Sequence, residues 1–178
     1  MSKTFSLRGV YEIADNSVGQ TINIFDYVSP DRTRAWKVVR AYFWPVDSRA
    51  DTGSDGNGKY VMTSTLYTDF AKQGAWDAQI DPEDNRAFGF GIWSGYKFEN
   101  GGSDFIAAHG SSGIVEYVID PDTLVSKELH IAFASTAFGT TNPTRKWAYM
   151  IQLEAKKVTP SESLFQQIKG MGQNINNP

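Results

Sequence analysis

The amino-acid sequence predicts an all-β fold of about eight antiparallel strands followed by one short helix. Apolar residues recur with a period of two over most of the chain, which is the alternation of a half-buried strand. The stretches between these runs are rich in Gly, Asn and Asp, the residues that turns require. A pattern that begins and ends like a helix occurs near the C-terminus. These observations favour a sandwich, a jelly roll or a barrel.

The strands can be assigned in chain order from their alternation and from the turns between them. The first run pairs Phe5, Leu7 and Tyr11 with intervening polar residues, and Gly19 opens the second. The third has apolar residues on both faces, which is typical of a strand covered on two sides. The expected strands lie at residues 5–13, 20–27, 34–44, 60–67, 87–93, 114–119, 129–134 and 146–156.

The last strand has the clearest alternation. Trp147, Tyr149, Ile151 and Leu153 point one way, and most of the residues between them are polar. One face of this strand is therefore expected to be dry and the other mostly wet. We place these four residues on the core face, and we assign Trp36 of the third strand a structural role as well.

One helix is predicted at about residues 160–170, followed by a flexible tail at 171–178. Thr159 is a capping residue, Pro160 suits the first helical position, and Glu162 completes a capping box. The apolar residues of this segment share one face of the helix, and they are Leu164, Phe165 and Ile168.

Length and composition favour one soluble domain over residues 1–178. Hydrophobic residues make up 40% of the 178, far more than a disordered chain contains. No apolar run approaches the ~20 residues of a membrane helix, and no signal-peptide core follows the first basic residues. The chain has no Cys, which excludes disulfides and thiol catalysis, and only two His.

The acidic residues and the histidines offer weak candidates for chemistry. Asp51 and Asp55 lie in a polar loop that could hold a metal ion, but the loop lacks the spacing of a calcium-binding EF-hand. We interpret it as a solvated loop. A carboxylate cluster and the two histidines are similarly better explained by turns and structure than by catalysis; the residues concerned are Asp77, Asp81, Glu83, Asp84, His109 and His130. We therefore predict no enzyme and no cofactor.

A short basic stretch is the stronger candidate for binding. Arg32, Arg34, Lys37 and Arg40 fall among aromatic residues, a combination that can hold nucleic-acid phosphates and stack on bases. Strict alternation places Arg34 and Arg40 on the face of Trp36 and Lys37 on the other. The patch would then be divided, and ion pairs with aspartates would explain it equally well.

Four segments, taken in order, resemble the small capsid proteins of circular single-stranded DNA viruses known mainly from environmental sequencing. Residues 119–125 and 128–131 are similar to the "DPDHLIVEDLYI" segment of that family, in which a loop leads into a late strand. Residues 35–39 resemble its early "GWKVL" strand. Trp76 with residues 84–86 resembles "W…DNRQIAW". Residues 147–154 resemble its final "NYMIxLE" strand, which a short helix follows.

The resemblance implies a single jelly-roll domain that self-assembles into an icosahedral shell around a small single-stranded DNA genome. The implied location is the virion, with about sixty copies or a multiple as the partners. Such a shell would carry about −180 in formal charge, because each chain carries −3. Assembly is then expected to rely on apolar and aromatic contacts, assisted at most by a divalent cation between subunits. The sequence predicts no membrane partner and identifies no host receptor.

Two alternatives from other classes remain open at this point. A carbohydrate-binding jelly-roll module would stack sugars on Trp44, Trp76 or Trp93. A β-sandwich hydrolase would use the carboxylates of residues 77–83. Both require side chains that are exposed together in one cleft.

Overall fold

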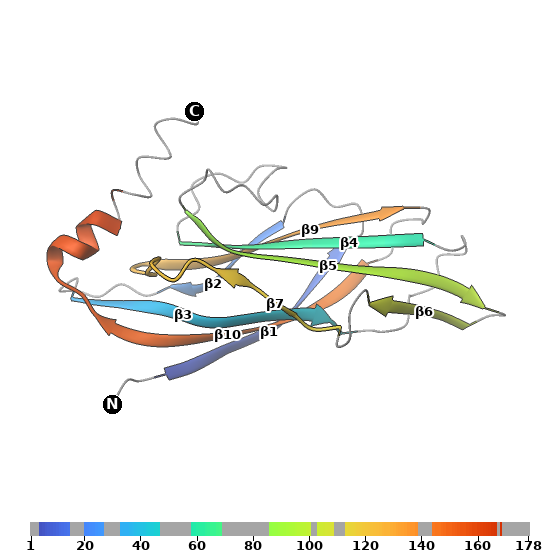
Figure 1. Cartoon of the computed structure of the whole chain (residues 1–178), viewed down its shortest axis with the longest axis horizontal. Helices are drawn as coiled ribbons and strands as arrows, with labels where there is room; N and C mark the ends of the chain where they lie inside the picture. Colours follow the sequence, from blue (N-terminus) through green and yellow to red (C-terminus); the bar gives the residue numbers. More distant parts are fainter. Residues whose placement is uncertain are drawn as a thin grey trace.

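In the computed structural model, the described part of the chain forms two antiparallel sheets and one short helix (Figure 1). The structure describes residues 4–14, 20–26, 33–46, 58–68, 86–100, 103–108, 113–138, 144–166 and 168. In these residues the strands are β1 (Thr4–Ala14), β2 (Gln20–Asp26), β3 (Arg34–Pro45), β4 (Gly58–Tyr67), β5 (Ala87–Asn100), β6 (Ser103–Ala108), β7 (Val115–Glu116), β8 (Val118–Ile119), β9 (Glu128–Phe138) and β10 (Thr144–Lys157).

The strand order defines a jelly roll. One sheet, here called sheet A, has the order β1-β10-β3-β7; the other, sheet B, has the order β2-β9-β4-β5-β6, with β8 also paired to β5. The pairs are nested along the chain: β1 pairs with β10, β2 with β9, β3 with β7 and β4 with β5. Nested pairing of this kind wraps a chain into two interlocked Greek keys. The predicted all-β jelly-roll class with a short C-terminal helix is confirmed.

The core lies between the two sheets and is built from aromatic and branched side chains. Phe43 of sheet A and Phe133 of sheet B are fully buried, with ring centroids 6.3 Å apart. Phe43 also packs over Gly91, where a Cβ atom would lie only 2.5 Å from the ring. The absence of a side chain at position 91 therefore allows the two sheets to approach closely.

The last strand presents its alternating apolar residues to this core. Trp147, Ile151 and Leu153 are at most 2% exposed, and Tyr149 is half-buried with its ring over Gly9 of β1. Trp36 is half-buried as well and packs edge-on against Phe5, with centroids 4.8 Å apart. The five residues thus all contact the core cluster or belong to it.

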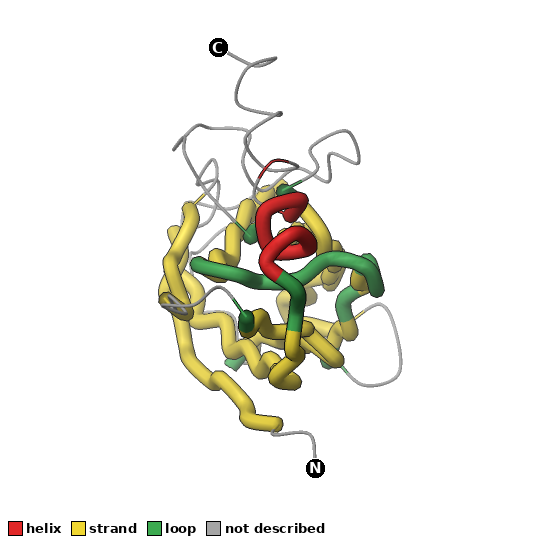
Figure 2. Tube along the Cα trace, turned by 90° about the vertical axis from the view of Figure 1, so that its left-hand side faces the viewer, coloured by secondary structure: helices red, strands yellow, loops and turns green. Residues whose placement is uncertain are grey.

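The helix spans 160–166 and begins as its sequence predicts. The backbone N–H of Thr159 donates to Glu162 Oε2 at 2.7 Å, and the backbone N–H of Glu162 donates to Thr159 Oγ1 at 3.2 Å. These reciprocal bonds form a capping box. The helix lies at one end of the sandwich (Figure 2). The predicted tail at 171–178 lies outside the described residues.

The helix faces in a direction that its amphipathic pattern does not indicate. Ser163 is buried, whereas Leu164, Phe165 and Ile168 are 46%, 66% and 51% exposed. Gln166 reaches the carbonyl oxygen of Asp122 with its Nε2 at 3.4 Å. A hydrogen bond from Gln166 thus ties the helix to the turn at 121–124, and its apolar residues remain at the surface. No helix among the described residues is long and apolar enough to cross a bilayer.

Candidate functional site

The basic residues of β3 are brought together by a register shift that alternation alone cannot reveal. Arg40 lies opposite Gln152 of β10, whereas Val38 lies opposite Leu153 and Lys37 opposite Glu154. Val39 is therefore an extra residue in β3, as in a β-bulge, and it reverses the faces of the residues before it. Lys37 and Arg40 consequently share one face. The sequence-based division of the patch between two faces is wrong for this pair.

That face is the outer face of sheet A, on the side opposite the core. Its rows can be read from the register across β1, β10 and β3: Thr4, Glu154 and Lys37; Ser6, Gln152 and Arg40; Arg8, Met150 and Tyr42; Val10, Ala148 and Trp44; and Glu12 with Lys146. Basic residues thus flank a central aromatic and apolar zone. This arrangement offers both cations for phosphates and rings for stacking.

The other two basic residues of the predicted patch are not seen to join this pair on the outer face. Arg34 is exposed at the first position of β3, where it pairs in register with Lys157 at the end of β10. Arg32 lies outside the described residues. Nucleic-acid binding by the four residues stays a prediction.

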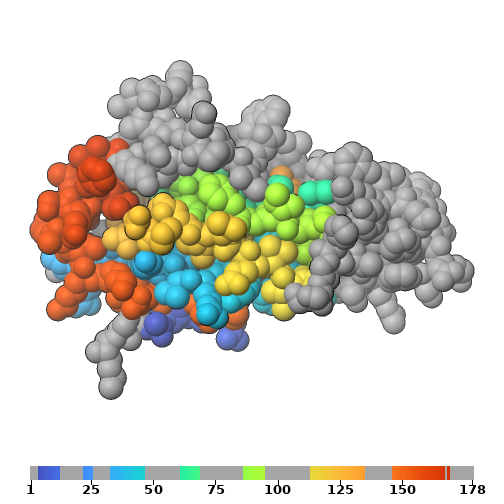
Figure 3. Space-filling model, viewed as in Figure 1, coloured from blue at the N-terminus to red at the C-terminus, as the bar shows by residue number. Residues whose placement is uncertain are grey.

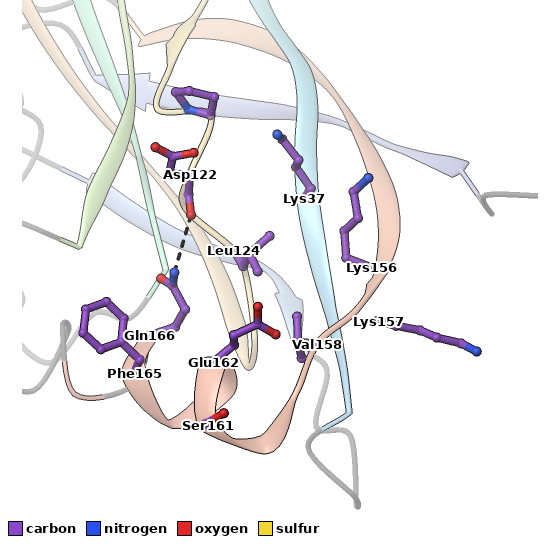
Figure 4. A pocket seen from close by; sticks show the side chains of 11 residues that line it. Lys37, Asp122, Leu124, Lys156, Lys157, Val158, Ser161, Glu162, Phe165 and Gln166 are labelled. Atoms are coloured by element: carbon purple, nitrogen blue, oxygen red, sulfur yellow. Dashed lines mark hydrogen bonds between the residues drawn. The ribbon is translucent and has the colours of Figure 1, made fainter.

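A groove of about 560 Å³ opens beside this face, between β3, the end of β10, the turn at 121–124 and the helix (Figure 4). Lys37, Lys156 and Lys157 contribute its cations, and Asp122 and Glu162 contribute its carboxylates. Its charges are therefore mixed. A lysine ammonium group is a mobile point charge rather than a fixed bidentate fork, so the groove is suited to loose contact with an anionic group.

Some of the charged groups in and beside the groove are already paired with other groups of the chain. Lys156 Nζ lies 3.0 Å from Glu154 Oε2, and the two side chains follow each other on the outer face. Exposed pairs of this kind contribute little to stability. In the groove, the pKa of Glu162 is lowered because the backbone N–H and the hydroxyl group of Thr159 donate hydrogen bonds to its carboxylate. The carboxylate is thus already used by the helix cap.

The residues considered for catalysis and metal binding do not form a site in the described part of the chain. His130 is buried on the outer side of sheet B, with Nε2 2.9 Å from Glu128 Oε2. The pKa of Glu128 is lowered by hydrogen bonds from Lys127 and then from His130. Among the described residues, no three His, Cys, Asp or Glu side chains are grouped so that they could hold a metal ion.

Most of the other candidates fall outside the described residues. Asp51 and Asp55, the carboxylates at 77–84 and His109 are among them. Trp93 is described, and it is only 3% exposed. Its ring packs edge-on against Trp147 at 5.2 Å, with an interplanar angle of 76°. Trp93 is therefore a core residue.

Sequence reasoning missed the basic residues that β1 and β10 add to the face. Arg8, Lys146 and Lys156 are far from residue 37 in sequence and join its face of sheet A through strand pairing. The signal that could have found them is the alternation of the first and last strands, since it places their polar residues on one surface. Without the pairing order, that surface cannot be assigned to the same sheet as β3.

Comparison with known proteins gives little beyond the architecture. No family model matches the chain, and no curated protein does. Solved structures with some likeness include that of infectious bursal disease virus Gx strain, at 11% identity and TM-score 0.36 over 92% of this chain and 34% of that one. Cocksfoot mottle virus matches at 10% identity and TM-score 0.35, over 90% and 100% of the two chains. The decameric BFDV capsid protein matches at 14% and 0.32, over 89% and 100%. This chain thus spans about a third of the first of these relatives, and at such TM-scores none of them bears on function.

Proposed function

We propose that this chain is a viral capsid subunit that self-assembles into an icosahedral shell enclosing a small single-stranded DNA genome. One observation carries the proposal: three of the four segments that resemble such capsid proteins lie on the elements that the resemblance predicts. The fourth, Trp76 with residues 84–86, lies outside the described residues except for Arg86. Residues 35–39 lie in β3, and 119–125 run from the last residue of β8 through the turn that leads to β9. Residues 147–154 lie in β10, which the helix follows.

The hydrogen bonds of the turn at 120–123 explain why its sequence begins with an aspartate. Asp120 accepts a hydrogen bond from the backbone N–H of Asp122 at 3.0 Å and another from Thr123 Oγ1 at 2.6 Å. An aspartate that holds the backbone two residues ahead is a typical turn former. Val125 then pairs with Trp36 through two backbone hydrogen bonds of 2.7 and 2.8 Å. The segment therefore ties the start of β3 to the turn that precedes β9.

Assembly requires surfaces that a lone subunit leaves uncovered. Val10, Val118 and Phe165 are 59%, 75% and 66% exposed, at the edge of sheet A, beside β5 and on the helix. Apolar groups of this size are expected at the centre of subunit contacts. They lie on three separate parts of the surface, as a subunit surrounded by neighbours in a shell requires.

The DNA is proposed to contact the outer face of sheet A. Lys37 and Arg40 are the basic residues of β3 on that face, and Tyr42 and Trp44 follow them along the strand. The test is the 260/280 nm absorbance ratio of particles made by the wild type and by a Lys37→Gln/Arg40→Gln variant, after nuclease treatment. A Lys127→Gln variant, which also removes an exposed cation but lies just before β9 of sheet B, is the control.

The proposal expects a lower nucleic-acid content in the double variant and an unchanged content in the control. Particles that retain the same DNA without these two cations would contradict the contact. Because the binding is electrostatic, the difference should shrink as salt is raised.

Self-assembly itself is tested by size-exclusion chromatography with light scattering on the purified chain. A shell of about sixty chains of 19.8 kDa has a mass of about 1.2 MDa. A monomer that binds glycans would instead support the carbohydrate-binding alternative. Trp93 cannot serve as a sugar-stacking residue in that alternative, because its ring is only 3% exposed.

A further inference from the structure

Strand β1 is a long edge strand with nothing paired to its outer side in the described part of the chain. It pairs with β10 without interruption from Thr4 to Ala14 and ends sheet A. The opposite edge, β7, has two residues, and β2 at the edge of sheet B has seven with a register shift. A free edge presents a row of unpaired N–H and C=O groups. Figure 3 shows the described part of β1 at the lower border of the molecule.

The sequence of β1 lacks most of the features that usually protect such an edge. Proteins blunt free edges with proline, with charged side chains, above all lysine, or with a bulge, and the two charges of β1, Arg8 and Glu12, are opposite in sign. Thr4–Ala14 reads TFSLRGVYEIA and contains neither proline nor lysine, and its register has no shift. On its core side, Phe5, Leu7 and Tyr11 are only half-buried, and on its outer side Val10 is 59% exposed. These are the groups that one more strand would cover.

We propose that β1 pairs antiparallel with β1 of a second copy of this chain, so that two sheets A join across a two-fold axis. This inference deepens the proposed function and rests on it, because it names one subunit contact of the shell. Strand addition of this kind uses backbone hydrogen bonds for affinity and side chains for register. A two-fold contact uses the same surface on both copies.

The charges of β1 select one register. Its outer-face residues include Arg8, Val10 and Glu12. With Val10 opposite Val10 of the second copy, Arg8 lies opposite Glu12 of that copy, twice across the axis. With Arg8 or Glu12 on the axis, like charges would instead face each other, which is destabilising. Complementary charge therefore places Val10 on the axis.

The same register extends the rows of sheet A. Val10 lies beside Ala148, which lies beside Trp44. Pairing joins this apolar row to its copy, so that Val10 gains an apolar neighbour on its exposed side. Glu12 already lies opposite Lys146 on β10 of its own chain. In the proposed register it therefore lies between Lys146 and Arg8 of the second copy. Each side chain in the contact thus meets a complementary one.

A cysteine scan tests both the contact and its register, because the chain has no Cys of its own. Val10→Cys is expected to form disulfide-linked dimers under mild oxidation. Opposed residues of antiparallel strands have Cα atoms about 4.5–5.5 Å apart, within the range that a disulfide spans. In the proposed register, two Arg8→Cys chains place their Cα atoms about 14 Å apart and two Ser6→Cys chains about 27 Å apart. Neither can be bridged.

Lys127→Cys is the control for random collision, because the Lys127 side chain is 57% exposed and precedes β9 of sheet B, away from β1. Efficient cross-linking of the Val10→Cys chain, with little in the other three, supports the proposal. Cross-linking that is equally strong for Arg8→Cys or Lys127→Cys overturns it.

Charge reversal gives a second test that does not depend on a disulfide. Arg8→Glu and Glu12→Arg are each expected to weaken dimerisation by roughly tenfold at low salt, since each places like charges opposite one another at two symmetric positions. The Arg8→Glu/Glu12→Arg double variant restores opposite charges and should recover the dimer. Glu116→Arg, at the other edge of the same face, should change nothing. Sedimentation velocity measures all four, and failure of the double variant to recover refutes the register.

The outcomes separate this contact from the proposed function. Cross-linked dimers of the Val10→Cys chain without larger particles would uphold the β1 contact and reject the capsid role. Particles that form with Val10→Cys chains that do not cross-link would uphold the capsid role and reject the contact.

Discussion

The buried hydrogen bond between Ser64 and Tyr117 is a sensitive test of how the jelly roll is held together. Tyr117 lies between β7 of sheet A and β8, which pairs with sheet B, and it is 4% exposed. Its hydroxyl group is hydrogen-bonded to Ser64 Oγ of β4. The Ser64 hydroxyl donates to the carbonyl oxygen of Ala132 at 3.0 Å. The proton between the two hydroxyl groups therefore comes from Tyr117.

This direction predicts unequal effects for the two truncations. Tyr117→Phe removes the donor together with the bond, which costs about 1 kcal/mol. Ser64→Ala leaves the tyrosine hydroxyl buried without its acceptor and also removes the bond to Ala132, so it costs about 2–4 kcal/mol. The double variant has neither hydroxyl group, so none is left buried without a partner. Its loss of unfolding free energy should therefore be smaller than the sum of the two single losses.

Urea or thermal unfolding of the four proteins measures these differences. At this chain length, 1 kcal/mol corresponds to a shift in Tm of about 2–4 °C. The reasoning is refuted if Tyr117→Phe is as destabilising as Ser64→Ala, or if the two costs simply add.

The same tyrosine predicts a loss of stability in alkali. Burial raises the pKa of Tyr117 far above its ordinary value of 10.0. Below pH 10 the phenol is protonated in both states, and above it only the unfolded chain ionises. The unfolded state then binds fewer protons, so stability falls by about 1.4 kcal/mol per pH unit from this residue. The alkaline slope should be shallower by that amount in Tyr117→Phe than in the wild type.

Three other substitutions test separate parts of the fold. Gly91→Ala should destabilise the chain by about 1–3 kcal/mol, because its Cβ would lie 2.5 Å from the fully buried Phe43 ring. Gly9→Ala should cost less, although its Cβ would lie equally close to Tyr149, since that ring is half-buried and can move outward; chemical denaturation compares the two variants. Thr159→Ala should fray the helix without unfolding the sandwich, which hydrogen exchange would register as lost protection confined to 160–166. Equal stability of the two glycine variants, or global unfolding of Thr159→Ala, would contradict these expectations.

The sequence alone predicts the strands well where alternation and burial coincide. In β10 the period-two pattern assigns Trp147, Ile151 and Leu153 to the core because that strand has a dry face and a mostly wet face. The helix start is equally local, since a capping box depends on residues three apart. Such features need no knowledge of the rest of the chain.

Features that depend on pairing could not be predicted in this way. The extra residue at Val39 is defined only against β10, and it moves Lys37 onto the face of Arg40. Likewise, Ser163 is buried while Phe165 stays exposed, because the way the helix packs depends on the distant turn that Gln166 contacts. β6, which forms a hairpin with β5, was not expected at all. Each of these depends on where distant segments meet.

The candidate nucleic-acid-binding surface was likewise predictable only in the part that is local in sequence. A basic and aromatic stretch was visible in residues 32–44, but the contributions of Arg8, Lys146 and Lys156 follow only from the sheet order. The exposed edge of β1 also follows from topology, because any strand of similar sequence could have been internal.

Electron cryomicroscopy of the chain expressed alone tests the capsid proposal most directly. The account predicts closed particles with icosahedral symmetry, in which each subunit is a jelly roll with the strand orders β1-β10-β3-β7 and β2-β9-β4-β5-β6. A chain that remains monomeric at every protein and salt concentration, with or without single-stranded DNA, would contradict it.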